Sequence, residues 1–424
     1  MKISIANPSV APHVKQNVVA YFDSGILSTF YTTFFSHSKN KLSALLSKIP
    51  GLNKELKKRA FDSLPIEHFR SKPTLEIIRS IAARKLNAKV TDAIWHYGEL
   101  AFDHWVAKQI DAKKIDAIHT YEHCALITLQ IAKQKGIYTI YEQISQHHTF
   151  FTKIANQQLD LYPALETPDT DLLVNDKAAK RNKRRDDELE LADTILCNSS
   201  FTKRTLVEAG VEEKKITVIP LAFPQPIEKI RERHISEPVK FLYAGNQSLR
   251  KGIHLLYEAW RICDFNAIEA ELWLVGKMEL PENLRENLPG NVMIKNTIPH
   301  EELLELYTEA DVFVLPTLAD GFGMVITESM SQGTPVITTE NSAGPDLIKD
   351  NENGWIIPAG DLVALVSQLK NIVEEPESLT AISSAALVSA GSWQWDDYHN
   401  MLIKKINTLY KGSKKTQCNL KKSV

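Results

Sequence analysis

The chain has 424 residues, enough for two or three domains, and a net charge of −2, which excludes a dedicated nucleic-acid-binding protein because such a protein would be strongly basic. Its four cysteines are far apart and form no CxxC motif, so the sequence predicts neither a disulfide framework nor a zinc site. The start of the chain has too short an apolar run for a secretory signal, and no stretch approaches the ~20 apolar residues that span a bilayer. We therefore expect a cytoplasmic protein.

The first half of the chain alternates short apolar runs with amphipathic runs, which is typical of an α/β unit. The β-branched and aromatic run 27–35 predicts a strand, and residues 38–115 are mostly polar with a helical pattern. Predicted strands lie at 2–6, 27–35, 116–121, 137–142, 194–199 and 215–221, and predicted helices at 14–25, 124–136, 177–191 and 201–210.

Prolines and charges then crowd together over 222–238, which predicts a linker. The alternation restarts after it and indicates a second doubly wound parallel sheet. The predicted strands are 239–245, 271–276, 291–296, 311–317, 334–339 and 354–359, and the predicted helices are 252–263, 300–310, 323–333, 345–350, 362–373 and 391–410. We predict two Rossmann-like domains over 1–222 and 239–395, joined by a linker at 223–238 and followed by a helix at 396–412 and a disordered basic tail at 413–424.

The segment DGFGMVITE, residues 320–328, lies where a predicted strand ends and a helix begins. Gly321 and Gly323 let the backbone approach a ligand, and the helix N-terminus suits a phosphate. The two acids, Asp320 and Glu328, are eight positions apart, about 12 Å along a helix, so they can reach opposite ends of a nucleotide-sugar. The alternative is an ordinary strand–turn–helix junction capped by Asp320.

A second loop, YAGNQSLRKG, also joins a strand to a helix. Arg250 and Lys251 stand immediately before Gly252, where the helix begins. Cations are unfavourable at a helix N-terminus unless an anion such as a diphosphate lies between them and the helix. Two solvated surface cations are the alternative.

Together these segments resemble the retaining glycosyltransferases of family 4, which have the GT-B fold. The resemblance covers most of residues 190–412 and includes RKG at 250–252, LVG ending at Gly276, and the run TPVITT…SAGPDLI…NENGWIIPAGD. The final SWQWDDY resembles the segment where the family's last helix crosses back onto the first domain. The sequence departs from the family pattern in three places: Asp320 replaces a Glu, Asn246 stands where many members have Arg, and the first loop lacks the Gly-Gly pair.

The resemblance implies that the first domain holds the acceptor and the second holds a nucleotide-sugar. Lys251 and Arg250 would contact the diphosphate, and Glu328 would hydrogen-bond the ribose. Asp320, with the amides of Gly321, Phe322 and Gly323, would contact the transferred sugar and distal phosphate. Gly245, Asn246 and Gly276 complete the donor-binding set that we predict.

Four histidines follow two predicted strands of the first domain. His119 and His123 flank one strand end, and His147 and His148 follow another. In the family a histidine on such a loop often lies near the transferred sugar, so we take His123 and His147 as catalytic candidates and His148 and His13 as acceptor-side candidates. The alternative is that each is simply a hydrogen-bonded polar residue.

The triplet Asp169-Thr170-Asp171 matches the DxD pattern of metal-dependent glycosyltransferases, but it follows a proline-broken polar stretch and not a strand. We therefore predict no metal site and no cofactor besides the nucleotide-sugar. The segment 39–59 has seven Lys or Arg and one acid among apolar residues, and this pattern fits either a solvated helical hairpin or a peripheral contact with an anionic membrane. The basic run 180–185 is interpreted as a solvated helix face.

The leading hypothesis is a retaining, metal-independent transferase that moves a sugar from a nucleotide-sugar to a glycan or lipid-linked acceptor in cell-surface polysaccharide synthesis. A nucleotide-sugar epimerase, or a synthase that uses a sugar or phosphate acceptor, can share the same fold. A non-catalytic nucleotide-sugar-binding protein is the alternative of a different class.

Overall fold

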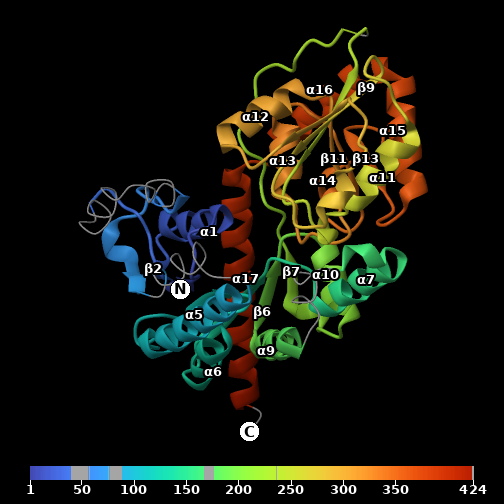
Figure 1. Ribbon diagram of the computed structural model, residues 1–424. Helices are drawn as coiled ribbons and strands as arrows, with labels where there is room; N and C mark the ends of the chain where they lie inside the picture. The colour runs from blue at the N-terminus through green and yellow to red at the C-terminus, as the bar shows by residue number, and fades with distance from the viewer. Residues whose placement is uncertain are drawn as a thin grey trace.

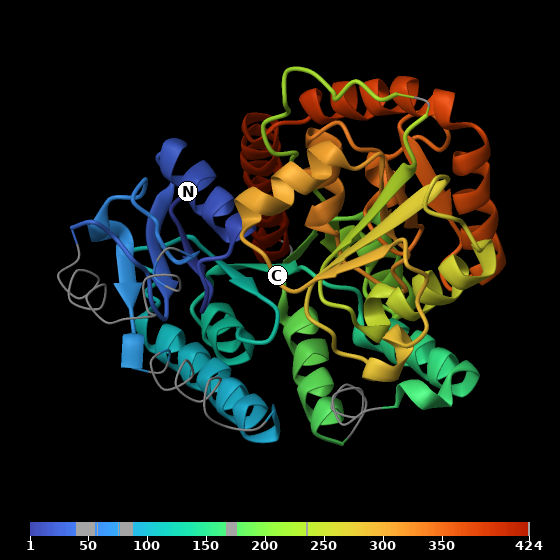
Figure 2. The ribbon, with the colours of Figure 1, turned by 45° about the horizontal axis from the view of Figure 1, so that its top comes forward.

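The computed structural model describes residues 1–39, 56, 58–74, 76, 88–166, 176–234 and 236–422. Two parallel sheets with helices on their faces form two bodies that face each other, and helix α17 (Trp395–Lys422) runs from one body along the other (Figures 1 and 2). The predicted fold class, two Rossmann-like α/β units, is confirmed.

The N-terminal body contains a seven-stranded sheet in the order β3-β2-β1-β4-β5-β6-β7. Its inner strands, such as ISIA and TILC, are apolar and buried on both faces, as parallel strands require. The edge strand β3 was not predicted, because only three residues pair there. The strands are β1 (Ile3–Ala6), β2 (Leu27–Thr32), β3 (Phe69–Ser71), β4 (Ala117–Tyr121), β5 (Tyr138–Gln143), β6 (Thr194–Cys197) and β7 (Ile216–Val218), and the helices are α1 (Pro12–Asp23), α5 (Ala88–Gln109), α6 (Leu126–Gln134), α7 (His148–Leu161), α9 (Asp176–Leu191) and α10 (Ser200–Glu208).

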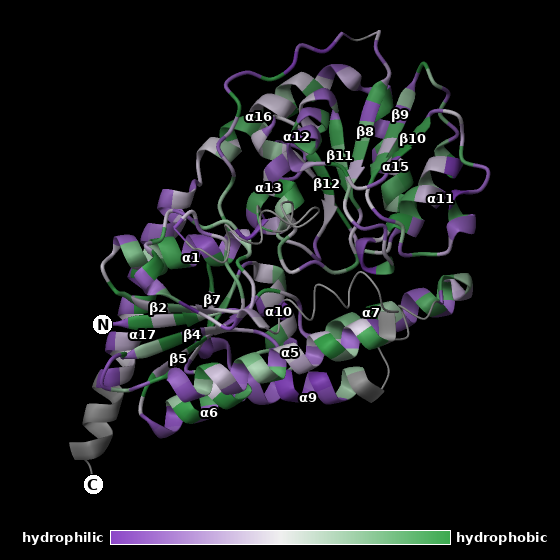
Figure 3. Cartoon of the chain, turned by 60° about the vertical axis from the view of Figure 1, so that its left-hand side comes forward, coloured by the Kyte–Doolittle hydropathy of each residue, from purple (hydrophilic) through white to green (hydrophobic). Residues whose placement is uncertain are grey.

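The C-terminal body contains a six-stranded sheet in the order β10-β9-β8-β11-β12-β13, and Figure 3 shows its strands as mostly hydrophobic. The predicted strands of this half are all present. Helix α16, rich in Ala and Ser, was not predicted. The strands are β8 (Val239–Ala244), β9 (Ala270–Val275), β10 (Val292–Lys295), β11 (Val312–Leu315), β12 (Val336–Thr339) and β13 (Gly354–Ile357), and the helices are α11 (Ile253–Cys263), α12 (His300–Glu309), α13 (Met324–Ser331), α14 (Gly344–Leu347), α15 (Leu362–Glu374) and α16 (Leu379–Gly391).

Helix α17 returns to the N-terminal body, as predicted, and packs along α1. Tyr398, Leu402 and Ile406 recur every four residues on one face of α17 and are buried in the core of the seven-stranded sheet. The expected disordered tail is wrong in part, because α17 continues to Lys422. No helix within the described ranges is both long enough and apolar enough to cross a bilayer.

Helix α7 belongs to the N-terminal half of the chain but packs against the C-terminal body. Its Ala155 is buried in the core cluster of the six-stranded sheet, and its Gln158 accepts a hydrogen bond from His254 of α11 at 2.9 Å if the imidazole carries the Nε2 proton. The 222–238 segment begins close to the residues that precede α17. There the Trp393 indole N–H donates to the Pro220 carbonyl at 3.0 Å. The two bodies are therefore joined at three places in the chain.

Candidate functional site

A cleft of about 840 Å³ lies between the two bodies and receives side chains from both. It is lined at the N-terminal side by the loops after β4 and β5 and by helices α5 and α9, and at the C-terminal side by the loops after β8, β9 and β11. Open parallel sheets bind ligands at this edge. The predicted site residues that line the cleft are His123, His148, Arg250, Asp320 and Gly321.

Asp320 is held between the two cations of the RKG loop. Lys251 forms an ion pair with its carboxylate, and Arg250 Nη1 lies 3.3 Å from Oδ1. Burial favours the neutral acid, but the charges of Lys251 and Arg250 outweigh burial and lower the pKa of Asp320. Burial also lowers the pKa of Lys251, against the attraction of Asp320. The loop thus carries an ionised carboxylate and two cations, one net positive charge at neutral pH, with Arg250 nearer the cleft.

Gly321 is required by a contact between the two bodies. A Cβ at this position would lie 2.0 Å from the Ile144 carbonyl oxygen, and the Gly321 carbonyl accepts hydrogen bonds from the hydroxyls of Ser199 and Thr202. Phe322 is buried in the core cluster of the N-terminal body. The sequence predicted close approach of a ligand at Gly321; the structure places backbone of the other body there.

Gly323 is the N-cap residue of helix α13 and has φ +80°, a left-handed conformation that favours glycine. It has no side chain that could cap the helix. The first turn of α13, which begins four positions after Asp320, therefore has no side-chain cap among the described residues. This arrangement is the kind that suits an anion.

Gly245 and Gly276 end adjacent strands, β8 and β9, and their backbones touch. Both have positive φ, and a Cβ on Gly276 would lie 1.9 Å from the Gly245 carbonyl oxygen. Asn246 donates from Nδ2 to Glu279 at 2.8 Å, and Glu279 lines the cleft. The glycines thus fix the shape of the loops at the donor side.

Glu328 lies along α13, and it is absent from the described residues that line the cleft. Its carboxylate is 3.3 Å from His300 Nε2 at the start of α12. Burial raises the pKa of Glu328, and His300 opposes this shift. Sequence reasoning missed His300, because its partner is 28 residues away in the chain and on another helix.

His123 occupies the turn after β4 with φ 78°, which is unusual for a residue other than glycine. Its Nε2 lies 2.8 Å from Glu122, and Arg185 donates to its Nδ1 at 3.0 Å. Burial alone would raise the pKa of Glu122, but His123 and Arg185 together with hydrogen bonds lower it to about 2.

The basic run 180–185 is not the solvated face that the sequence suggested. Figure 3 shows α9 as mostly hydrophilic. Several of its cations nevertheless pair with acids of the N-terminal body. Arg184 pairs with the fully buried Asp103, and Arg181 pairs with Asp92 at 2.7 Å. Arg185 reaches the cleft. Glu122 and Arg185 are therefore candidate functional residues that sequence reasoning missed, since their partners come from distant helices and loops.

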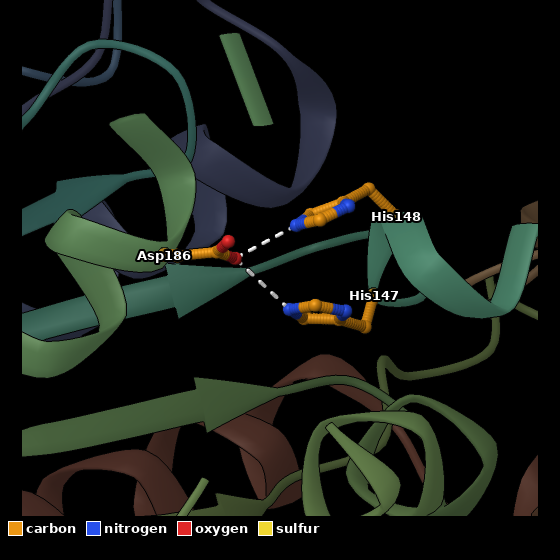
Figure 4. Close-up of side chains that lie close together, drawn as sticks. All are labelled: His147, His148 and Asp186. Carbon is orange, nitrogen blue, oxygen red and sulfur yellow. Dashed lines mark hydrogen bonds and ion pairs between the residues drawn. The ribbon is translucent and has the colours of Figure 1, made fainter. Parts of the chain in front are cut away.

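His147 and His148 both turn toward Asp186 of α9 (Figure 4). His147 caps α7 and is buried, and His148 lines the cleft.

His13 is not among the described residues that line the cleft. Its ring packs edge-on against Tyr121, and its Nε2 is buried without a hydrogen-bond partner among the described residues. Burial lowers the pKa of His13, against the pull of Glu142. Residues 40–55, 57, 169 and 171, which include most of the basic segment and the DxD acids, lie outside the described residues.

Residues 225–387 match the family described as Glycosyl transferases group 1, and this stretch includes the RKG loop and Asp320–Glu328. Over this stretch, less than half of its length, the chain is similar to a glycosyl transferases group 1 domain. This match bears out the family resemblance that the sequence predicted for the second half of the chain.

Two curated relatives are glycosyltransferases of bacterial polysaccharide synthesis by name. The amylovoran biosynthesis glycosyltransferase AmsK of Erwinia amylovora is 27% identical over 205 residues, 45% of this chain and 50% of that protein. The capsular polysaccharide biosynthesis glycosyltransferase CapM of Staphylococcus aureus is 26% identical over 206 residues, 44% of this chain and 53% of that protein. The chain thus spans about half the length of the curated relatives it matches.

Solved structures share the fold over nearly the whole chain. A sucrose-phosphate synthase from Thermosynechococcus elongatus superposes with a TM-score of 0.61 at 18% identity, covering 97% of this chain and 100% of that one. HepE of Anabaena, solved with UDP-glucose, gives a TM-score of 0.58 at 14% identity, covering 96% and 100%. At these identities the likeness concerns the fold.

Proposed function

We propose that this protein is a retaining, metal-independent glycosyltransferase that moves a sugar from a nucleotide-sugar to a glycan or lipid-linked acceptor, in the cytoplasm and for cell-surface polysaccharide synthesis. The observation that carries the proposal is a partly buried Asp320 held by Lys251 and Arg250 at the edge of the cleft, within the stretch that matches the transferase family. The names of the two curated relatives support the choice of polysaccharide synthesis.

The donor diphosphate is assigned to the RKG loop and the start of α13. Arg250 lines the cleft, and Lys251 already pairs with Asp320, so the two cations exceed the single carboxylate by one charge. A diphosphate arriving at this loop shares the cations with Asp320 and gains the free amides of α13. Gly245, Asn246 and Gly276 shape the base-side loops, and Glu328 is assigned to the ribose.

Asp320 is assigned to the transferred sugar. Glycosyl transfer develops positive charge at the anomeric carbon while the departing nucleotide gains negative charge. A fixed carboxylate beside the carbon and fixed cations beside the phosphate stabilise both changes without reorganisation. Asp320, Arg250 and Lys251 lie in contact, so one loop pair supplies both charges.

The acceptor is assigned to the N-terminal wall of the cleft. His123 and His148 line this wall beside Glu122 and Arg185. These groups provide hydrogen-bond donors and acceptors for sugar hydroxyls. His147 is assigned to support His148, because both lie against Asp186. His13 stays an acceptor-side candidate, although it is not among the described residues that line the cleft.

The test is product analysis with a panel of nucleotide-sugars. Incubation with each donor, with and without oligosaccharide or lipid-linked acceptors, is expected to give transfer with retained anomeric configuration, or slow donor hydrolysis when no acceptor is present. Sugar inversion without transfer would indicate an epimerase. Transfer only to a sugar phosphate would indicate a synthase, and binding without turnover would indicate a non-catalytic binding protein. Any of these three results would overturn the proposal.

A further inference from the structure

Three potential metal ligands meet at the junction of helices α7 and α9. His147 and His148 come from the start of α7, and Asp186 comes from α9 (Figure 4). Both Nε2 atoms lie near one carboxylate oxygen, Asp186 Oδ1, at 3.1 and 2.7 Å, and all three ligand atoms lie within 4.8 Å of one another. Among the described residues this histidine cluster is the one group with metal-ligand spacing.

The geometry points to a binding site for a zinc-type divalent cation at His147, His148 and Asp186, joining α7 to α9. Two imidazoles and a carboxylate are a ligand set that Zn²⁺ accepts, with a fourth position left for water. Bonds of about 2.0–2.1 Å at a tetrahedral angle separate neighbouring ligand atoms by roughly 3.3 Å, close to the spacings found here. Imidazole ligands favour Zn²⁺, Ni²⁺ and Co²⁺ over Mg²⁺.

The surroundings of His147 support a ligand role. Its Nδ1 lies 2.8 Å from the Thr149 hydroxyl, and its backbone N–H donates to the Thr205 hydroxyl at 2.9 Å, so the ring is held at Nδ1 and the backbone is held by α10. With a metal on Nε2, a protonated Nδ1 would donate to the Thr149 hydroxyl, the outer contact that metal-bound histidines commonly make, and would give up the capping hydrogen bond that Nδ1 accepts from the Thr149 backbone N–H.

Arg185 precedes Asp186 and would repel a cation if it pointed to the cluster. Its guanidinium is instead directed to His123, with Nε 3.0 Å from Nδ1 and Nη2 2.9 Å from Nε2. The Asp186 carboxylate supplies the compensating negative charge at the cluster. The site is therefore compatible with a divalent ion despite the basic helix.

The position of the cluster gives a bound ion a structural effect. Helix α7 packs on the C-terminal body through Ala155 and Gln158, whereas α9 packs on α6 and β5 of the N-terminal body. An ion held by both helices ties the two bodies together at the edge of the cleft. Its ligands include His148, which is also assigned to the acceptor wall, and none of the groups assigned to the donor.

The test uses untagged full-length protein stripped with EDTA and desalted. We expect calorimetry with Zn²⁺ to give about one ion per chain, Co²⁺ to give the visible bands of a tetrahedral site, and Mg²⁺ to give neither. Zn²⁺ is also expected to raise the melting temperature.

Three variants identify the ligands. His148→Ala, Asp186→Asn and His147→Asn are each expected to weaken Zn²⁺ binding at least tenfold, and the last keeps a residue that caps helices well. His234→Ala, at an exposed position in the linker segment, is the matched control and should bind like wild type. Melting in EDTA checks that each variant is folded. Zn²⁺ binding that is absent in wild type, or equal in wild type and all three variants, would overturn the site; neither result depends on transfer activity.

Discussion

At the residue scale, the donor loop is governed by one buried carboxylate and its two cations. Asp320 neutralises Lys251 and part of Arg250 in the protein without ligand. A substitution at Asp320 therefore changes two quantities: the charge beside the sugar and the number of free cations beside the phosphate. These two effects act in opposite directions on catalysis and on nucleotide binding.

Asp320→Asn is expected to lower kcat at least tenfold, about 1.4 kcal/mol, because the carboxylate gains most as charge develops in the transition state. Affinity for the nucleoside diphosphate should hold or rise, since Lys251 and Arg250 are released. Glu328→Gln, in contrast, should mainly raise the donor KM. Single-turnover kinetics and calorimetry measure the two quantities. If Asp320→Asn left the rate of the chemical step unchanged, Asp320 would have no catalytic role and would serve only in the turn before helix α13.

Glu122 provides a pH-dependent contribution to stability. Its pKa is lowered to about 2 from an ordinary 4.5, so its carboxylate stabilises the fold above pH 4.5 and this contribution is lost as the pH falls from 4.5 toward 2. The shift corresponds to about 3 kcal/mol. In Glu122→Gln, the free energy of unfolding measured with urea should fall less between pH 4.5 and pH 2 than it does in wild type. Glu309→Gln, at an exposed position, should follow wild type. Parallel acid profiles for wild type and Glu122→Gln would rule out this role for the carboxylate.

At the scale of elements, the loop after β11, which carries Asp320, contacts the loop after β5 at Gly321. Its missing side chain leaves room for the Ile144 carbonyl, so the position of Asp320 depends on how closely two separate elements approach. Gly321→Ala must push these loops apart, because both contacting groups are backbone. The control Gly290→Ala has open space around its Cβ.

We expect Gly321→Ala to reduce kcat/KM at least tenfold with little change in nucleoside diphosphate affinity. The reason is that the groups assigned to bind phosphate lie on one body and the assigned acceptor wall lies on the other. Small-angle scattering should show a more open molecule. Gly290→Ala should match wild type in both measurements. A fully active, equally compact Gly321→Ala protein would show that the contact is dispensable.

Helix α17 is fixed to α1 by a buried polar contact. The Tyr398 hydroxyl donates to Asn17 Oδ1 at 2.7 Å, and both residues are buried. Tyr398→Phe leaves this acceptor without a partner and should lower the free energy of unfolding by about 1–3 kcal/mol. Tyr410→Phe removes an exposed contact to Asp116 and should cost less than about 1 kcal/mol. Urea denaturation of the two variants compares them directly, and equal losses would contradict the expected anchoring role.

At the scale of the whole molecule, the proposed function divides the chemistry between the two bodies: the groups assigned to the donor lie on one body, and the groups assigned to the acceptor lie on the other. They are joined by the linker segment, by α17 and by α7. The cleft therefore exists only when all three connections bring the bodies together.

Sugar transfer is expected to continue after EDTA treatment, because Arg250, Lys251 and the start of α13 are assigned to the leaving diphosphate. Initial rates with and without EDTA, and after adding Mn²⁺, measure this. Activity lost in EDTA and restored by Mn²⁺ would contradict the assignment and return attention to Asp169 and Asp171. Zn²⁺ binding at the histidine cluster is measured separately and does not decide this question.

Much of the architecture could be predicted from local pattern. Alternating apolar runs gave the strands of both sheets, since a buried parallel strand and an amphipathic helix each leave their own period in the sequence. The glycines and acids of DGFGMVITE lie within nine residues of the chain, so this loop could be singled out as a candidate from the sequence. Strand β3 was not predicted because three residues are too few to show a periodic pattern. Helix α16 was not predicted because its Ala and Ser residues form no apolar stripe.

The amino-acid sequence by itself determined the two α/β units, the family of the second one and the candidate residues of the donor loop, because these depend on neighbours in the chain. Tertiary structure alone decided that Lys251 pairs with Asp320, that Gly321 accommodates Ile144, and that His147 and His148 meet Asp186. It also placed α7 on the opposite body. These contacts join residues about 40 to 180 positions apart, and local periodicity carries no information about which distant elements will pack together.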